Sequence, residues 1–227
     1  LVVPPRAANR DVHVIRIFED PGHYRAYVGE ARAWSAGIWE PGRRELVLLF
    51  RGEQRAAETM SVIFHEGFHQ YLHYAYEMKE APVWFNEGHA CLFEAAGMGP
   101  RGSVALRESA SRTRLILADI DAAAERLPQI LQMSYDQFYG GDDEFRNLNY
   151  AVAWGLVYYL RKGATLRRNS RDAQLLSAIT RSVTAGEDPR AAAAAALAFI
   201  DLDALRDNFV LFWRQGRRDA IRHDPFK

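Results

Sequence analysis

The stretch that most constrains this chain is a His-Glu-x-x-His motif inside an apolar-periodic segment, which predicts a helix over residues 54–78. Residues four apart share one face of a helix, so His65 and His69 can direct two imidazoles at one ion. Glu66 would project beside that ion, where it suits a general base that takes a proton from a metal-bound water. The motif therefore predicts a metal site, and an ordinary helix with a chance match is the competing interpretation.

A second motif, Trp84-Phe85-Asn86-Glu87-Gly88, follows a break at Pro82. Proline suits the first turn of a new helix, which is predicted over residues 83–96. Seventeen residues separate His69 from Glu87 (87 − 69 − 1), enough to finish one helix, turn and bring the next helix back antiparallel. Glu87 is therefore the predicted third ligand. Two His and one Glu leave the fourth position of a tetrahedral zinc ion open for water, as in catalytic sites.

These two motifs resemble those of the gluzincin metallopeptidases of the thermolysin and aminopeptidase type, whose third ligand is the Glu of an Asn-Glu pair on the following helix. The interval between the motifs is shorter than in the best-known members, so the chain looks like a divergent branch. It is most similar to peptidase-MA-like bacterial domains of unknown function, in which a Pro-x-Trp-x-x-Glu-Gly segment like residues 82–88 recurs. The resemblance covers about residues 60 to 95 and implies a Zn²⁺-dependent peptidase.

Hydrolysis also requires a donor that stabilises the oxyanion, typically a Tyr or His in this chemistry. Aminopeptidase-type gluzincins carry such a Tyr at the start of a helix, ten residues before a Leu, and Tyr150 and Leu160 have this spacing. The resemblance thus implies Tyr150 as the second catalytic residue beside Glu66, with Tyr139 and Tyr159 as weaker candidates. The Lys-Gly pair that often follows the Tyr is absent, and packing in an aromatic core helix is the alternative role for Tyr150.

Three further side chains are candidates for the surroundings of the ion. His73 lies four residues beyond His69, but successive positions of this kind advance about 6 Å along a helix, so a role other than third ligand is favoured. Cys91, the only cysteine, lies four residues after Glu87, and a small buried apolar role is favoured for it. Glu94 could accept a hydrogen bond from the second nitrogen of a ligand imidazole.

Three segments before the predicted zinc helix have the pattern of strands: residues 11–18, 33–39 and 45–50. We expect them to form a small antiparallel sheet, and the gluzincin resemblance implies the same. The edge strand of such a sheet commonly holds an extended peptide by main-chain pairing. Residues 35–39 are the candidate for this strand.

The rest of the chain is predicted to be mainly helical, with a strongly apolar aromatic helix over residues 145–161 and helices at 171–184, 189–199 and 201–215. No Pro/Ser/Gly-rich linker and no repeat interrupts it. The predicted fold class is α+β of the zincin-like kind. We expect a single domain over residues 1–227, with a sheet and zinc-helix lobe over 1–97 and a helical lobe over 98–227.

Composition excludes several classes of partner. The chain has 29 basic and 29 acidic residues, so nothing favours nucleic acid or an anionic membrane. No run of eighteen apolar residues occurs, which predicts no membrane span. A single cysteine allows no internal disulfide, so the cysteine content does not indicate the cellular compartment. The sequence begins at Leu1 and not at Met. This start is compatible with a secreted or periplasmic protein from which an upstream segment has been removed.

The leading hypothesis is therefore a peptidase that acts on a peptide or protein substrate. Endopeptidase action is favoured because the chain lacks the Gly-x-Met-Glu-Asn motif that grips the N-terminus in aminopeptidases. A non-catalytic zinc-binding or protein-interaction domain on the same scaffold is the first rival, and an all-helical structural domain with chance histidines is the second. Nothing in the sequence indicates the oligomeric state.

Overall fold

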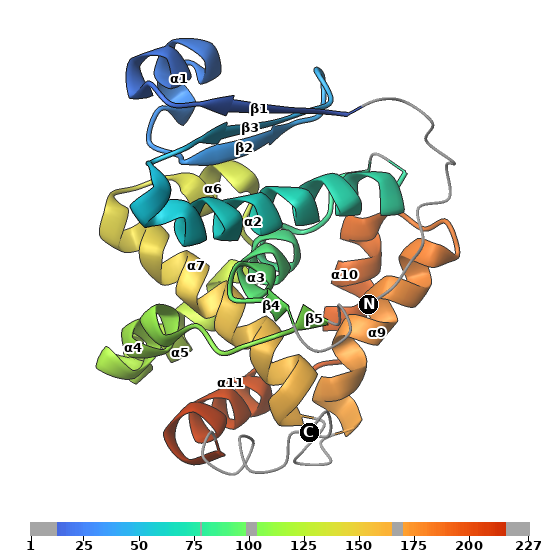
Figure 1. Ribbon diagram of the computed structural model, residues 1–227. Helices are drawn as coiled ribbons and strands as arrows, with labels where there is room; N and C mark the ends of the chain where they lie inside the picture. Colours follow the sequence, from blue (N-terminus) through green and yellow to red (C-terminus); the bar gives the residue numbers. More distant parts are fainter. Residues whose placement is uncertain (1–12, 78, 99–103, 165–169, 217–227) are drawn as a thin grey trace. The chain divides into compact units, whose positions relative to one another are not determined.

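The computed structural model describes residues 13–77, 79–98, 104–164 and 170–216 (Figure 1). These residues fall into two compact units. The sheet unit comprises residues 13–77, 90–98 and 104–107, and the helical unit comprises residues 79–89, 108–164 and 170–216. Helix α3 (Val83–Glu94) is continuous and contributes residues to both units. The expected single domain with two lobes stays a prediction.

The N-terminal sheet has three strands in the order β1 (Val14–Phe18), β3 (Glu45–Leu49) and β2 (Gly37–Glu40). Strands β2 and β3 are antiparallel, whereas β1 and β3 are parallel. The prediction of an antiparallel sheet was therefore wrong for one of the two pairings. The candidate edge strand predicted over residues 35–39 is β2, and it does lie at an edge of the sheet.

The central position of β3 explains this mixed pairing. Leu46, Val47 and Leu48 are at most 5 % exposed, so β3 is the strand that requires cover on both sides. Strand β1 exposes Ile15 and Ile17 by more than half and suits an edge. After β1 the chain crosses through helix α1 (Pro21–Val28) and a 3-10 turn (η1, Glu30–Arg32), so β1 does not form a hairpin with the next strand.

The predicted zinc helix is α2 (Ala56–Ala75), which follows a 3-10 turn (η2, Glu53–Arg55) and packs against β2 and β3 (Figure 1). The approach to β2 is close because Gly37 has no Cβ, which would collide with Val62. The second half of α3 packs on α2 through Phe68 and Phe93, whose rings stack with centroids 5.2 Å apart. A two-stranded ribbon, β4 (Gly97–Met98) and β5 (Val104–Ala105), completes this unit.

The helical unit is built around α7 (Asp143–Tyr158), which packs against α4 (Ala110–Ala118) and α5 (Ile120–Ile130). Trp154 of α7 is fully buried, and its ring centroid lies 5.3 Å from that of Trp213. The remaining helices are α6 (Tyr135–Tyr139), the π-turn η4 (Tyr159–Gly163), α9 (Ser170–Thr184), α10 (Pro189–Leu197), α11 (Leu202–Leu211) and the π-turn η5 (Phe212–Gly216). A small sheet with a mostly helical remainder makes the chain α+β, as predicted.

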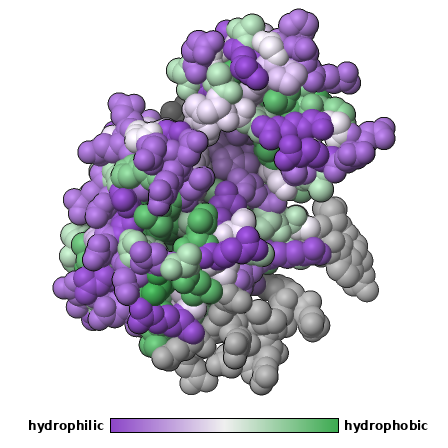
Figure 2. All heavy atoms as spheres, turned by 90° about the vertical axis from the view of Figure 1, so that its left-hand side faces the viewer, coloured by the Kyte–Doolittle hydropathy of each residue, from purple (hydrophilic) through white to green (hydrophobic). Residues whose placement is uncertain are grey.

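The face drawn in Figure 2 is mainly hydrophilic, and its apolar residues gather mostly in the lower left part of the view. Within the described ranges, no helix combines the length and the apolar character needed to cross a bilayer.

Candidate metal centre

Helix α2 directs both motif histidines to one side of the sheet unit. The ring centroids of His65 and His69 are 4.7 Å apart and the ring planes are 82° to each other. The His65 side chain is 12 % exposed, so its imidazole is largely shielded from water. Two imidazoles on successive turns of one helix can bind a single cation.

A carboxylate lies against one nitrogen of the first histidine. Nδ1 of His65 is 2.7 Å from Oε1 of Glu94, the last residue of α3. A carboxylate in this place would favour the tautomer with the proton on Nδ1, which leaves the lone pair of Nε2 for a metal. Glu94, which the sequence suggested as a partner for a ligand imidazole, makes this contact.

The same unit contains a second possible arrangement of ligands. The ligand atoms of His65, Cys91 and Glu94 all lie within 4.8 Å of one another, and Cys91 is fully buried. Imidazole, thiolate and carboxylate are all ligands that zinc accepts. In this arrangement Glu94 would bind the metal directly instead of supporting His65. His65 therefore belongs both to this set and to the set predicted from the sequence.

The candidate base, Glu66, is fixed by the edge strand. Its Oε2 accepts a hydrogen bond of 2.7 Å from the backbone N–H of Trp39 in β2, and the residue is 8 % exposed. A single well-placed donor restricts the carboxylate to one orientation. The same contact occupies a main-chain donor of the strand that was predicted to hold a peptide.

His73, also on α2, lies between aromatic side chains of β2 and α2. Its ring centroid is 6.0 Å from Trp39 and 5.1 Å from Tyr74. Burial lowers the pKa of His73 below its usual value, which favours the neutral ring. These neighbours suit a packing role.

In the helical unit, the predicted third ligand Glu87 lies on the first half of α3 and is 2 % exposed. The hydroxyl of Tyr139 donates a hydrogen bond of 2.5 Å to its Oε1. Burial and the negative charge of Glu87 raise the pKa of Tyr139 well above its usual value. The phenol therefore keeps its proton and remains a donor that fixes the rotamer of Glu87.

The neighbouring Asn86 is held in the same way. Its side-chain amide donates to the hydroxyl of Tyr135 at 2.9 Å, and Tyr135 donates in turn to the carbonyl of Ala81 at 3.2 Å. Tyr135 and Tyr139 lie one turn apart on α6, so this short helix clamps the Asn-Glu pair. We had not predicted α6 from the sequence. The available signal was its capping box, in which Ser134 and Gln137 bond each other's backbone N–H groups.

The residue after Glu87 allows α3 to approach α7 at backbone contact. A Cβ on Gly88 would lie 2.5 Å from the carbonyl oxygen of Ala153 and 2.7 Å from Cγ2 of Val157. His89, next in the chain, is fully buried, with Nδ1 2.7 Å from the carbonyl oxygen of Phe85 and Nε2 2.9 Å from Arg161. Burial first, and then the charge of Arg161, hold the pKa of His89 well below its usual value, so His89 is a neutral core residue.

Tyr150, the predicted oxyanion donor, lies on α7 in the aromatic cluster around α6. Its ring centroid is 5.3 Å from Phe138 and 6.3 Å from Tyr139. The hydroxyl of Tyr139, a weaker candidate from the sequence, bonds Glu87. Tyr159 instead donates a buried hydrogen bond of 2.6 Å to Asp172. The helical unit therefore brings Glu87 and Tyr139 together and keeps Tyr159 in the core.

The chain matches none of the curated proteins with which it was compared. Residues 59–185 match the family described as "Protein of unknown function (DUF1570)". This match spans 127 of the 227 residues (185 − 59 + 1), more than half of the chain, and it includes both motifs. The chain therefore belongs to the DUF1570 family of proteins of unknown function.

Proposed function

We propose that this protein is a zinc-dependent peptidase of the gluzincin kind, with zinc held by His65, His69 and Glu87. The observation that carries the proposal is the pair of imidazoles on one helix face, of which His65 has Nδ1 against Glu94 and so offers Nε2. When bound, zinc would act as a Lewis acid that polarises a carbonyl and lowers the pKa of water, so that a base can convert the water into a nucleophile.

The continuity of α3 supports Glu87 as the third ligand. Residues four and seven apart share a face of one helix, so Glu87 lies one turn before Cys91 and two turns before Glu94. The face that presents Glu94 to His65 therefore also carries Glu87. Tyr139 holds Oε1 of Glu87, so Oε2 is the atom that would coordinate the ion.

The chain's own groups would divide the remaining work as follows. Glu66 would take a proton from the attacking water and pass it to the leaving amine, and the N–H of Trp39 holds it in position for this role. Strand β2 would pair with the main chain of an extended peptide. Tyr150 would stabilise the oxyanion, whereas the bond from Tyr139 to Glu87 favours a positioning role for Tyr139. Endopeptidase action is proposed because the chain lacks the Gly-x-Met-Glu-Asn motif of aminopeptidases.

Metal analysis of two variants tests the ligand set. We expect close to one zinc ion per purified chain and hydrolysis of an unfolded protein substrate that a chelator abolishes. Glu87→Gln should lower the zinc affinity by about tenfold or more, because it removes a charged ligand. Cys91→Ser should leave the affinity unchanged, because its thiol is not a ligand in this arrangement. Both affinities are measured by competition with a chromogenic chelator.

The reverse outcome would favour a second candidate function. The proximity of His65, Cys91 and Glu94 suits a non-catalytic zinc site, since thiolate ligands are typical of structural zinc. In that case Cys91→Ser would lose zinc, Glu87→Gln would keep it, and chelation would lower the melting temperature of a protein that cleaves nothing. Such a result would contradict the peptidase proposal.

The hydroxyl of Tyr139 provides a separate test of how Glu87 is positioned. Tyr139→Phe should lower the zinc affinity by about tenfold, because partners that orient a ligand typically contribute this much. The ring contacts with Tyr135, Phe138 and Tyr150 remain, so any drop in melting temperature comes from the lost hydroxyl and should be similar in the control. Tyr159→Phe is the matched control, since it removes a hydroxyl bonded to Asp172. Equal zinc affinity in both variants would show that Tyr139 does not position the ligand.

A further inference from the structure

A pocket with three arginines lies at the amino end of α2, in the sheet unit. It has a volume of about 700 Å³. Arg25 comes from α1, Arg51 from the segment after β3, and Arg55 from the turn that leads into α2. We call this the arginine pocket. Its other lining residues are Glu19, Pro21, Leu49, Phe50, Gly52 and Glu53.

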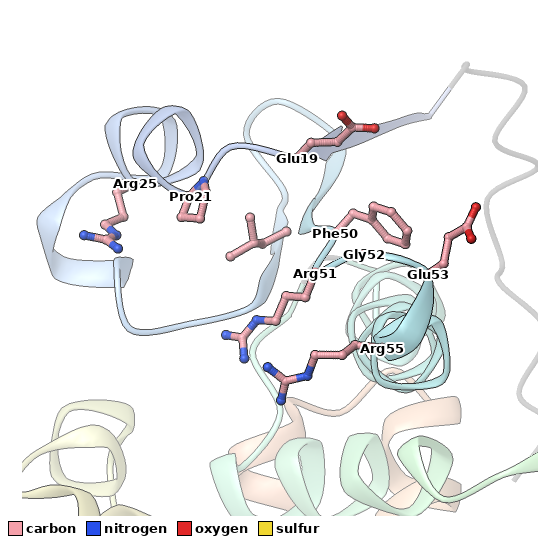
Figure 3. Close-up of a pocket in the computed structure, with 9 residues that line it drawn as sticks. Glu19, Pro21, Arg25, Phe50, Arg51, Gly52, Glu53 and Arg55 are labelled. Atoms are coloured by element: carbon pink, nitrogen blue, oxygen red, sulfur yellow. The ribbon is translucent and has the colours of Figure 1, made fainter.

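The charges in this pocket are segregated. Figure 3 shows the guanidinium groups of Arg51 and Arg55 side by side, directed to the same side of the pocket as Arg25. The carboxylates of Glu19, at the top of the view, and of Glu53, to the right of the Phe50 ring, point away from the guanidinium groups (Figure 3). The arginine side of the pocket is therefore a positively charged surface, although the chain as a whole has no net charge.

Two of the three guanidinium groups are available to a ligand. Arg55 pairs with Glu58, with Nη2 2.8 Å from Oε2. Within the part of the chain that the structure describes, the side chains of Arg25 and Arg51 make no ion pair, and both residues are exposed. Two unpaired guanidinium groups from different segments can each bind a carboxylate by a two-pronged hydrogen bond. The amino end of a twenty-residue helix adds a favourable potential for anions.

We propose that the arginine pocket binds an acidic stretch of a polypeptide. Three of its lining residues, Pro21, Leu49 and Phe50, are apolar and suit the alkyl and backbone parts of a peptide between its carboxylates. Inorganic phosphate would use the guanidinium groups and leave these apolar residues uncovered. The proposal rests on the proposed function only where the polypeptide is taken to be the substrate. Ten residues of helix, about 15 Å, separate Arg55 from His65, which corresponds to about five residues of extended peptide between the acidic stretch and the cleaved bond.

Binding of a labelled peptide to the full chain tests the pocket without any requirement for cleavage. The host is the Glu66→Gln variant, so that the peptide is not consumed, and binding is followed by fluorescence anisotropy. A peptide with a run of glutamates should bind at least about tenfold more tightly than the same peptide with glutamines. Raising the salt concentration should weaken this binding, because the paired charges are exposed.

Matched double variants assign the binding to the pocket. Arg25→Gln with Arg51→Gln should weaken glutamate-peptide binding by about tenfold or more. Arg114→Gln with Arg171→Gln removes the same total charge from exposed positions on α4 and α9, and should have little effect. All four sites are exposed, so circular dichroism melts should be unchanged.

Three results would overturn the proposal: equal binding of the glutamate and glutamine peptides, no loss in the Arg25/Arg51 variant, or displacement of the peptide by an equal concentration of inorganic phosphate. The last result would identify a phosphate site. Failure of the proposed function is distinguishable, because a protein without peptidase activity would still bind the glutamate peptide through this pocket.

Discussion

Replacement of Glu66 by glutamine should leave zinc bound and lower kcat/KM for peptide hydrolysis by about 10²- to 10⁴-fold, the usual contribution of a general base. Glutamine has nearly the same shape and keeps an oxygen that can accept the N–H of Trp39, so the link to β2 should survive. It cannot take a proton from water at neutral pH. The measurement combines zinc content, the melting temperature and steady-state hydrolysis of an unfolded protein.

Glu58 offers a matched control on the same helix. It lies in the first turn of α2, pairs with Arg55 and is 55 % exposed. Glu58→Gln should therefore change neither the zinc content nor the rate by more than about twofold. If Glu66→Gln cleaved the substrate at the wild-type rate, Glu66 would not be the base. If the variant lost its zinc, the role of Glu66 would be structural and its effect on the rate would say nothing about proton transfer.

The two helices of the candidate site could be predicted because their signals are local. The apolar period and the proline at position 82 bound α2 and α3 to within a few residues of the structure. Helical spacing alone places His65 and His69 on one face. Spacing from Glu87 also named Cys91 and Glu94, which α3 brings next to His65.

The pairing of strands could not be predicted, because it depends on contacts between segments that are far apart in the sequence. Residues 14–18 and 45–49 pair in parallel across an intervening helix and strand, and no local pattern specifies that partner. For the same reason, the sequence does not determine which set of residues would bind the metal. Whether Glu94 supports His65 or binds the metal depends on the side-chain arrangement around α3, which residue spacing does not determine.

The clamp on the Asn-Glu pair could not be predicted either, because α6 is only five residues long. Its capping box was visible, but a helix of this length has little intrinsic stability and forms mainly through its contacts. Tyr139 was therefore considered as an oxyanion donor and not as a partner of Glu87. In the structure, the hydroxyl of Tyr139 instead donates a hydrogen bond to the carboxylate of Glu87, the candidate third ligand.

Gly88→Ala should reduce the free energy of unfolding by about 3 kcal/mol, the upper part of the usual range for overpacking a core. The added methyl group would meet the carbonyl oxygen of Ala153 at 2.5 Å, and a backbone atom inside α7 cannot move aside as a flexible side chain can. The variant is compared with the wild type by urea denaturation, with and without excess zinc.

Gly67→Ala is the matched control, since it adds the same methyl group to the interior of α2. Apart from its chain neighbours and the backbone of α2 itself, no atom of the described residues lies within 4 Å of the position that this Cβ would occupy. Alanine there should stabilise the protein by about 0.5–1 kcal/mol, because glycine loses more backbone entropy in a helix. Equal stability of the two variants would show that α3 and α7 can separate slightly at no cost. A loss confined to Gly88→Ala, and accompanied by weaker zinc binding, would instead tie the close packing of α3 on α7 to the position of Glu87 on the preceding residue.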